Sequence, residues 1–201
     1  MHSSLLRAGA VVALVVLAGC RTTPPAPIAF PAAPPWELRK PQLQALAHFE
    51  LRGRVGVTTG HDGFNANLRW AQDGAHTQLT LEGPLGVGAV QVSASGADLT
   101  IVAANGTQLD SDAAHRELTT RLGFDPPLTS LRYWILGVPD PAAGATEEVD
   151  AGQQRLRALN QGGWHIDYPQ YLASGTQWLP ARLTLQREQV RVRMVVDDWQ
   201  L

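Results

Sequence analysis

The chain has 201 residues, of which 44% are hydrophobic and 17% are charged, and its formal net charge is −2. This composition is typical of a globular protein and argues against a disordered chain or a basic surface that binds nucleic acid. The single cysteine, Cys20, has no partner for an intramolecular disulfide, so stability must come from burial of apolar side chains.

The first twenty residues have the layout of a bacterial secretion signal. Arg7 supplies an early positive charge, an apolar run covers residues 8–17, and small residues precede Cys20. This run is too short for a permanent membrane helix, which needs about 20 apolar residues. The ending Leu17-Ala18-Gly19-Cys20 resembles a lipobox, whose cysteine receives a diacylglyceryl group. We predict a lipoprotein signal peptide over residues 1–19; an ordinary signal peptide that ends in cysteine is the alternative.

A proline-rich stretch follows the cysteine. Residues 21–35 contain six prolines and little that could pack, which is typical of an extended tether. About fifteen such residues at ~3.1 Å each would reach ~45 Å. In Gram-negative lipoproteins an aspartate after the cysteine commonly marks inner-membrane retention, so Arg21 favours the outer membrane. We expect an acylated tether over residues 20–35 and one folded domain over residues 36–201.

Helical and then strand-like patterns begin at Trp36. A short helix is expected there, with Pro35 in its first turn and Pro41 weakening its early part. The following segments alternate apolar and polar residues with period two, as half-buried strands do, and turn residues separate them. They therefore predict an antiparallel meander. The alternating segments are 49–57, 64–70, 78–82, 90–92 and 99–101.

Two helices are expected to interrupt the strands. Asp112 is suited to cap a helix that runs to Leu122 and ends at Gly123, and a second begins at residue 129 or 130 and runs to Leu136. The second helix has an apolar stripe of Leu131, Trp134 and Ile135.

Alternation resumes in the last quarter of the chain, and it raises the expected total to ten or eleven strands. So many strands with one apolar face each must wrap around a shared interior, as a barrel or a strongly curved sheet. The late alternating segments are 156–158, 164–168, 179–185 and 190–196.

Enzyme signatures are missing from the sequence. Ser95, Ser130 and Ser174 lack the Gly-x-Ser-x-Gly context of a nucleophile elbow, and the six histidines show no metal-binding spacing. Glu147-Glu148 and Asp197-Asp198 are adjacent pairs, which on a strand point to opposite faces, so we expect both pairs to be solvated. No catalytic or metal-ligating residue is predicted, although residues distant in sequence could still assemble a site.

Short motifs spread over the mature chain match one family in their order. After the lipobox and tether they are Trp36, Leu51-Arg52-Gly53-Arg54, Trp70, Gly83-Pro84-Leu85-Gly86, Leu-x-x-Trp-Ile-Leu-Gly-x-Pro over residues 131–139, Gly163-Trp164-x-Ile166-x-Tyr168, Leu179-Pro180 and Asp198-Trp199. With them the chain resembles the LolB family of outer-membrane lipoprotein receptors. The match covers essentially all of the mature chain, and the Leu-x-x-Trp-Ile-Leu-Gly-x-Pro segment is its most specific part.

The resemblance implies a fold and a task. The fold would be an incomplete, strongly curved antiparallel β-barrel of about eleven strands, which encloses a hydrophobic cavity under a helical lid. The protein would accept triacylated lipoproteins from the periplasmic carrier LolA and insert them into the inner leaflet of the outer membrane. Its partners would be that carrier, the acyl chains and outer-membrane phospholipid, with no nucleic acid. It would act as a monomer, without enzymatic activity and without a cofactor besides the N-acyl and S-diacylglycerol groups on Cys20.

The resemblance also assigns roles to residues. Taken alone, inward-facing apolar residues would simply fill a core; the family match favours a cavity lining instead. In the family, the leucine of the Pro84-Leu85-Gly86 loop enters the membrane, a role that an isolated exposed leucine would not suggest. The expected cavity and lid residues are Val55, Leu68, Trp70, Leu81, Val92, Ile101, Leu131, Trp134, Ile135, Ile166, Leu183 and Val192.

Two other functions stay open from the sequence. One is a structural or binding lipoprotein of the outer membrane, tethered by Cys20, with a filled core and no transfer activity. The other is a lipid-processing hydrolase, which the missing nucleophile motif disfavours.

Overall fold

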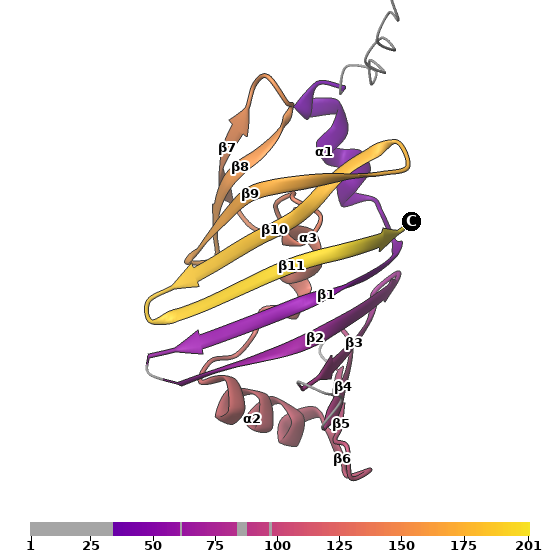
Figure 1. Cartoon of the computed structure of the whole chain (residues 1–201), viewed down its shortest axis with the longest axis vertical. Helices are drawn as coiled ribbons and strands as arrows, with labels where there is room; N and C mark the ends of the chain where they lie inside the picture. The colour runs from indigo at the N-terminus through magenta and orange to yellow at the C-terminus, as the bar shows by residue number, and fades with distance from the viewer. Residues whose placement is uncertain (1–33, 61, 84–87, 97) are drawn as a thin grey trace, which may run out of the picture. The chain divides into compact units, whose positions relative to one another are not determined.

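The structure is a computed structural model that describes residues 34–60, 62–83, 88–96 and 98–201. In this part of the chain, eleven strands form one antiparallel sheet and three short helices accompany it (Figure 1). The first half contains α1 (Trp36–Gln44), β1 (His48–Thr59), β2 (Asp62–Asp73), β3 (His76–Glu82), β4 (Ala89–Ser95), β5 (Asp98–Val102) and β6 (Gln108–Asp110). The second half contains α2 (Ser111–Leu122), α3 (Leu128–Trp134), β7 (Ala145–Asp150), β8 (Arg155–Gln161), β9 (Trp164–Ser174), β10 (Gln177–Arg187) and β11 (Val190–Gln200).

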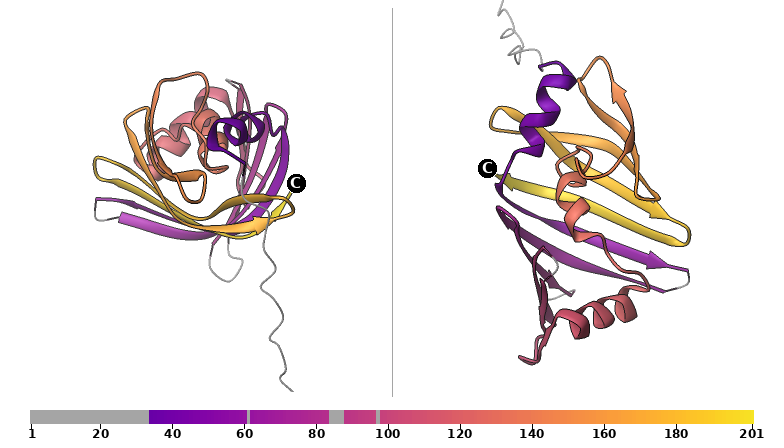
Figure 2. Two further views of the ribbon diagram at one scale, coloured as in Figure 1. Left: turned by 90° about the horizontal axis from the view of Figure 1, so that it is seen from above. Right: turned by 180° about the vertical axis from the view of Figure 1, so that it is seen from behind.

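The strand order is β6-β5-β4-β3-β2-β1-β11-β10-β9-β8-β7. Two meanders therefore meet where the first and last strands pair, with Val55 opposite Met194 and Val57 opposite Val192. The sheet bends around the helices (Figure 2). It does not close into a barrel: β6 and β7 are its two edge strands and do not pair with each other. This open, curved sheet with helices on its inner side confirms the predicted fold class.

Alternation along the strands decides which side chains form the core. On β1, Phe49, Leu51 and Val55 are buried, whereas Arg52 and Arg54 are exposed. The same period-two burial runs through β2 and most of β11, whereas in β8 and β10 neighbouring residues are buried together at Ala158–Leu159 and Leu179–Ala181. Because successive side chains point to opposite faces of a sheet, each strand contributes one row of apolar residues to the interior.

The centre of the sheet contains an irregularity opposite Gly53, where Asp197 of β11 has no partner in the register of β1. The register between β1 and β11 shifts between Arg52 and Gly53. A Cβ atom on residue 53 would lie 2.1 Å from the carbonyl oxygen of Val195, which is far inside van der Waals contact. Only glycine fits there. The glycine of the Leu51-Arg52-Gly53-Arg54 motif is therefore required by the close approach of the β1 and β11 backbones where the two meanders pair.

Several boundaries differ from the predicted ones. The sheet includes β6 and β7, whose segments show no apolar alternation, and α3 begins at Leu128. The prediction that Asp112 caps α2 is wrong. The helix begins at Ser111, because the pairing of Asp110 with Thr100 at the end of β6 leads the chain directly into it. Gly123 ends α2 in a left-handed conformation, with φ of 74°, as predicted.

The predicted solvation of Glu147 is also wrong. Its carboxylate accepts a hydrogen bond of 2.7 Å from the Trp36 indole nitrogen and one of 3.1 Å from the Lys40 ammonium group. Glu147 lies on the edge strand β7, where α1 covers it. Its neighbour Glu148 is more exposed and forms an ion pair of 2.7 Å with Arg157.

Candidate apolar binding cavity

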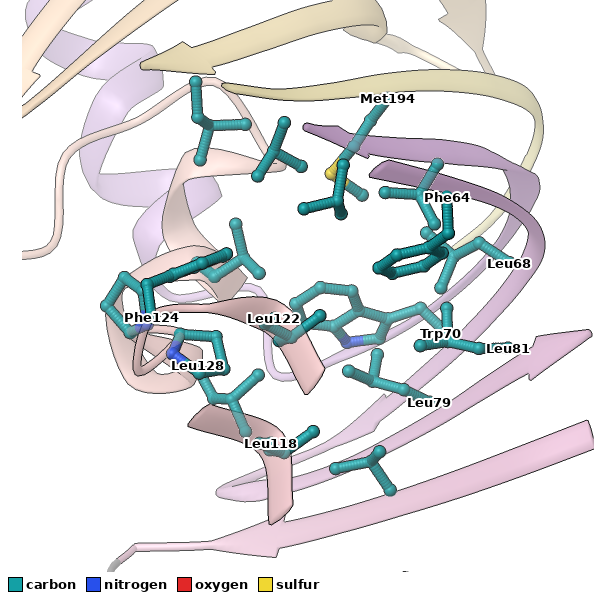
Figure 3. Close-up of a pocket in the computed structure, with 18 of the residues that line it drawn as sticks. Phe64, Leu68, Trp70, Leu79, Leu81, Leu118, Leu122, Phe124, Leu128 and Met194 are labelled. Atoms are coloured by element: carbon teal, nitrogen blue, oxygen red, sulfur yellow. The ribbon is translucent and has the colours of Figure 1, made fainter. Parts of the chain in front are cut away.

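An apolar cavity lies between the sheet and the segment that contains α2 and the start of α3. Its volume is about 100 Å³. Figure 3 shows that the side chains of both walls point toward one another across it. The sheet provides Val55, Val57, Phe64, Leu68, Trp70, Leu79, Leu81, Val92, Trp164, Leu185, Val192 and Met194. The opposite wall consists of Leu118, Leu122, Phe124, Pro126, Pro127, Leu128 and Leu131.

Apart from the indole N–H groups of Trp70 and Trp164, the lining is apolar, so the cavity suits hydrocarbon and offers no partner to a charged group. Its size sets a second limit. A dry protein cavity of roughly 150 Å³ holds one benzene molecule. The observed volume is smaller than that, so the interior is largely filled by its own side chains.

The structure divides the predicted cavity and lid residues into two groups. Those that line the cavity are Val55, Leu68, Trp70, Leu81, Val92, Leu131 and Val192. Those that are buried in the core away from the cavity are Ile101, Trp134, Ile135, Ile166 and Leu183. The division passes through α3, since Leu131 faces the cavity whereas Trp134, three residues later, does not.

Hydrogen bonds hold the end of α3 in the core. The Trp134 indole N–H donates to the Gln161 side-chain oxygen at 2.7 Å, and the Tyr168 hydroxyl donates to the Trp134 carbonyl at 3.0 Å. The same Gln161 oxygen accepts from the Asp140 amide at 2.8 Å, and the Gln161 amide group donates to the carbonyls of Asp140 and Ala143, each at 2.8 Å. These five residues, which we call the Gln161 cluster, explain why the Trp134 end of the predicted stripe is fixed.

The cavity wall formed by α2 is built differently. Leu118 and Leu122 lie one helical turn apart, and Phe124 follows the glycine that ends the helix. The Phe124 ring packs against Trp164, with the ring centroids 5.5 Å apart. The sequence predicted the end of α2 at Gly123 but not the place of Phe124, which depends on how the chain turns after that glycine.

At the other end of the domain, α1 is attached by polar contacts. Arg39 is only 2% exposed, and its guanidinium donates to the carbonyls of Gln154, at 3.1 Å, and Trp178. Burial away from water lowers the pKa of Arg39 from its usual value. The Trp36 backbone N–H donates to the Gln154 side chain at 2.7 Å. The start of the folded domain is thereby held to the β7–β10 side of the sheet.

Some predicted sites lie outside the described residues: Cys20, Pro84, Leu85 and Gly86. The strands on either side of the loop are described, and Glu82 of β3 pairs with Ala89 of β4. Across the described ranges no group of His, Cys, Asp and Glu residues has the arrangement of a metal site. None of the helices found there has the length and apolar character needed to cross a membrane.

Comparisons with solved structures support the fold. A LolA superfamily protein from Nitrosomonas europaea superimposes with a TM-score of 0.56 over 84% of this chain and 94% of that protein, at 8% sequence identity. A DUF1329 family protein from Desulfovibrio piger gives 0.53 over 82% and 90%, also at 8% identity. Identities this low establish similarity of architecture alone.

Comparisons of sequence are more specific. The family model "Outer membrane lipoprotein LolB" matches residues 47–199. The outer-membrane lipoprotein LolB of Nitrosococcus oceani is 33% identical over 95% of both chains. The LolB of Pseudomonas putida F1 is 32% identical over 82% of this chain and 80% of its own length. With this family match and these relatives, the chain belongs to the LolB family.

Proposed function

We propose that the protein is a lipid-anchored receptor of the outer membrane. It accepts triacylated lipoproteins from a LolA-type carrier and inserts them into the inner leaflet, with their acyl chains passing through the apolar cavity. The observation that supports this most strongly is an apolar cavity between a curved sheet and a helical wall, in a chain of the LolB family. Cys20 would carry the N-acyl and S-diacylglycerol groups that anchor the receptor.

The free energy of hydration makes such a shelter necessary. At ~0.8 kcal/mol per methylene, exposing three acyl chains of about fifteen carbons costs on the order of 35 kcal/mol. A cavity of about 100 Å³ cannot hold even one of these chains, so cargo binding must move a wall. The α2 wall is the one that moves, because its contacts with the sheet are apolar and can be exchanged for contacts with the acyl chains.

The direction of transfer needs no chemical step in this proposal. The protein is not an enzyme; the cargo moves from carrier to receptor to bilayer because each site binds the acyl chains more favourably than the one before. The receptor acts as a monomer, and outer-membrane phospholipid is the final acceptor.

Leu85 gives the proposal its sharpest test. We propose that this leucine enters the membrane and couples release of the cargo to its insertion. Leu85→Glu should still accept lipoprotein from the carrier but deliver it poorly to liposomes, since a charged side chain opposes insertion into hydrocarbon. Leu38→Glu is a matched control, because Leu38 is an exposed leucine on α1, at 60% exposure, outside the loop. Normal delivery by Leu85→Glu would remove this residue from the mechanism.

A binding measurement separates the receptor from a tethered structural lipoprotein. The Cys20→Ala chain, which cannot be acylated, is titrated with a fluorescent fatty acid. A receptor should bind the probe in its interior, and excess unlabelled fatty acid should displace it. A structural lipoprotein with a permanently filled core should not bind it. Transfer from a loaded LolA-type carrier to this chain then tests the receptor function itself.

A further inference from the structure

A second hollow lies beside the cavity, and it has a different chemistry. It is a groove of about 440 Å³ between the α2–α3 segment and the ends of strands β3–β5. Its lining is mixed, with a guanidinium, two carboxylates, an imidazole and hydroxyl groups. Its polar residues include Thr129, Arg132 and Tyr133.

The groove and the apolar cavity share a wall. Pro126, Pro127 and Leu128 line both of them, so the chain between α2 and α3 separates a hydrocarbon-like space from a polar one. If α2 and this connection move aside to admit acyl chains, a ligand in the cavity can extend into the groove without crossing bulk water.

Arg132 occupies the polar side of this wall. One guanidinium nitrogen donates to the Gly74 carbonyl at 2.7 Å, and the other makes a long contact of 3.4 Å with the Leu46 carbonyl. Its Nε–H is buried and has no hydrogen-bond partner among the described residues. The guanidinium also lies 4.8 Å from the centre of the Tyr133 ring. A buried donor without an acceptor is rare in native proteins, and one explanation is an acceptor that arrives with a ligand.

We propose that this groove binds the polar head of the cargo, the part that joins three acyl chains to the first cysteine. This inference rests on the proposed receptor function. The head carries two ester carbonyls and one amide carbonyl, which are uncharged acceptors, and the first peptide bonds of the cargo follow it. Arg132 and the hydroxyl groups of Thr129 and Tyr133 supply donors for these carbonyls. The groove would thus distinguish a lipoprotein from a free fatty acid, while the cavity supplies the affinity for hydrocarbon.

Two probes on the Cys20→Ala chain test the proposal. One is a synthetic triacylated cysteinyl peptide, which has the complete head, and the other is diphenylhexatriene, an apolar dye with no polar group. Arg132→Gln removes the guanidinium. The double variant Thr129→Val with Tyr133→Phe removes two hydroxyl groups and leaves the Arg132 contacts to the backbone in place. Arg157→Gln, on the exposed side of β8, is the matched control for loss of an arginine.

We expect both groove variants to bind the lipopeptide roughly five- to tenfold more weakly, as for the loss of one or two hydrogen bonds. Dye binding and the thermal unfolding midpoint of the double variant should match those of the parent chain, and Arg157→Gln should behave as the parent. Unchanged lipopeptide affinity in the double variant and in a folded Arg132→Gln would overturn the groove assignment while the receptor function stands. If the parent chain binds neither probe, the receptor function fails and this inference fails with it.

Discussion

Two regions on the inner side of the sheet, the α2 wall of the cavity and the end of α3, differ in the contacts that hold them. The α2 wall meets the sheet through Leu118, Leu122 and Phe124, whose contacts are apolar and without fixed direction. The end of α3 is held by the Gln161 cluster, in which one buried side chain makes four hydrogen bonds. Leu118 and Phe124 are each 8% exposed and Trp134 is 1% exposed, so both regions are buried, but only the end of α3 is also held by directed hydrogen bonds.

The difference lies in what an opening would cost. When the α2 wall moves away from the sheet, an entering hydrocarbon chain restores its apolar packing, because dispersion and burial do not depend on precise geometry. Hydrogen bonds of Gln161 have no replacement in hydrocarbon, and each buried polar group left without a partner costs about 1–3 kcal/mol. The same ligand therefore loosens one wall and leaves the other in place.

Removal of the Gln161 side-chain amide should have the largest effect. Gln161→Leu leaves two donors and two acceptors without partners, and we expect a loss of about 4 kcal/mol in the free energy of unfolding, measured with denaturant. Gln78→Leu, at an exposed position on β3, is the control and should change stability by less than about 0.5 kcal/mol. Similar losses in the two variants would mean that the cluster does not hold this side of the domain.

A pair of leucine truncations compares the packing of the two regions. Leu183 is 1% exposed in solid core, whereas Leu79, at 8%, borders the cavity. We expect Leu183→Ala to cost about 4 kcal/mol of unfolding free energy and Leu79→Ala about 2 kcal/mol, because a side chain beside a void is packed less completely. Leu79→Ala should also bind the fatty-acid probe more tightly. Equal costs would contradict the distinction between a loosely and a tightly packed region.

An engineered disulfide tests the movement of α2 directly. A Cβ on residue 123 would lie 3.5 Å from the Thr59 Cβ, within the range that disulfides span. The double variant Thr59→Cys with Gly123→Cys, in the Cys20→Ala background, should take up the fatty-acid probe at least about tenfold more slowly when oxidised than when reduced. The single variant Gly123→Cys controls for the strain of a side chain at a positive φ. Equal uptake by both redox forms would show that α2 does not gate the cavity.

The sequence predicted the strands well where one face is apolar and the other polar. It failed at β7, whose Thr, Glu and Asp side chains give no alternation because the strand lies at an edge beneath α1. The hydrogen bond between Trp36 and Glu147 joins residues 111 positions apart in the sequence. The residues around either one give no indication that the two side chains meet. For Glu147, adjacency to another acid suggested solvent, but a tertiary hydrogen bond decides its environment.

The site was predictable only in part, for similar reasons. Helical spacing placed Leu131, Trp134 and Ile135 on one apolar stripe. Spacing does not predict which other element each of these side chains packs against. Phe124 faces the cavity because the chain turns at Gly123 and returns over the sheet, a path that depends on the whole fold. Period-two patterns identify the inner face of a sheet, but the boundary between cavity and filled core depends on packing between elements distant in sequence.

The pairing of β1 with β11 has a consequence for how the chain acquires its structure. The two meanders are joined in the middle of the sheet by β1 and β11, the first and last strands of the described chain. Until these two strands pair, neither meander has its central neighbour. Contacts between such distant residues form slowly, because the long intervening loop must close first. A chain built in this way completes its sheet only when β1 and β11 meet, so neither meander can reach its native surroundings by folding alone.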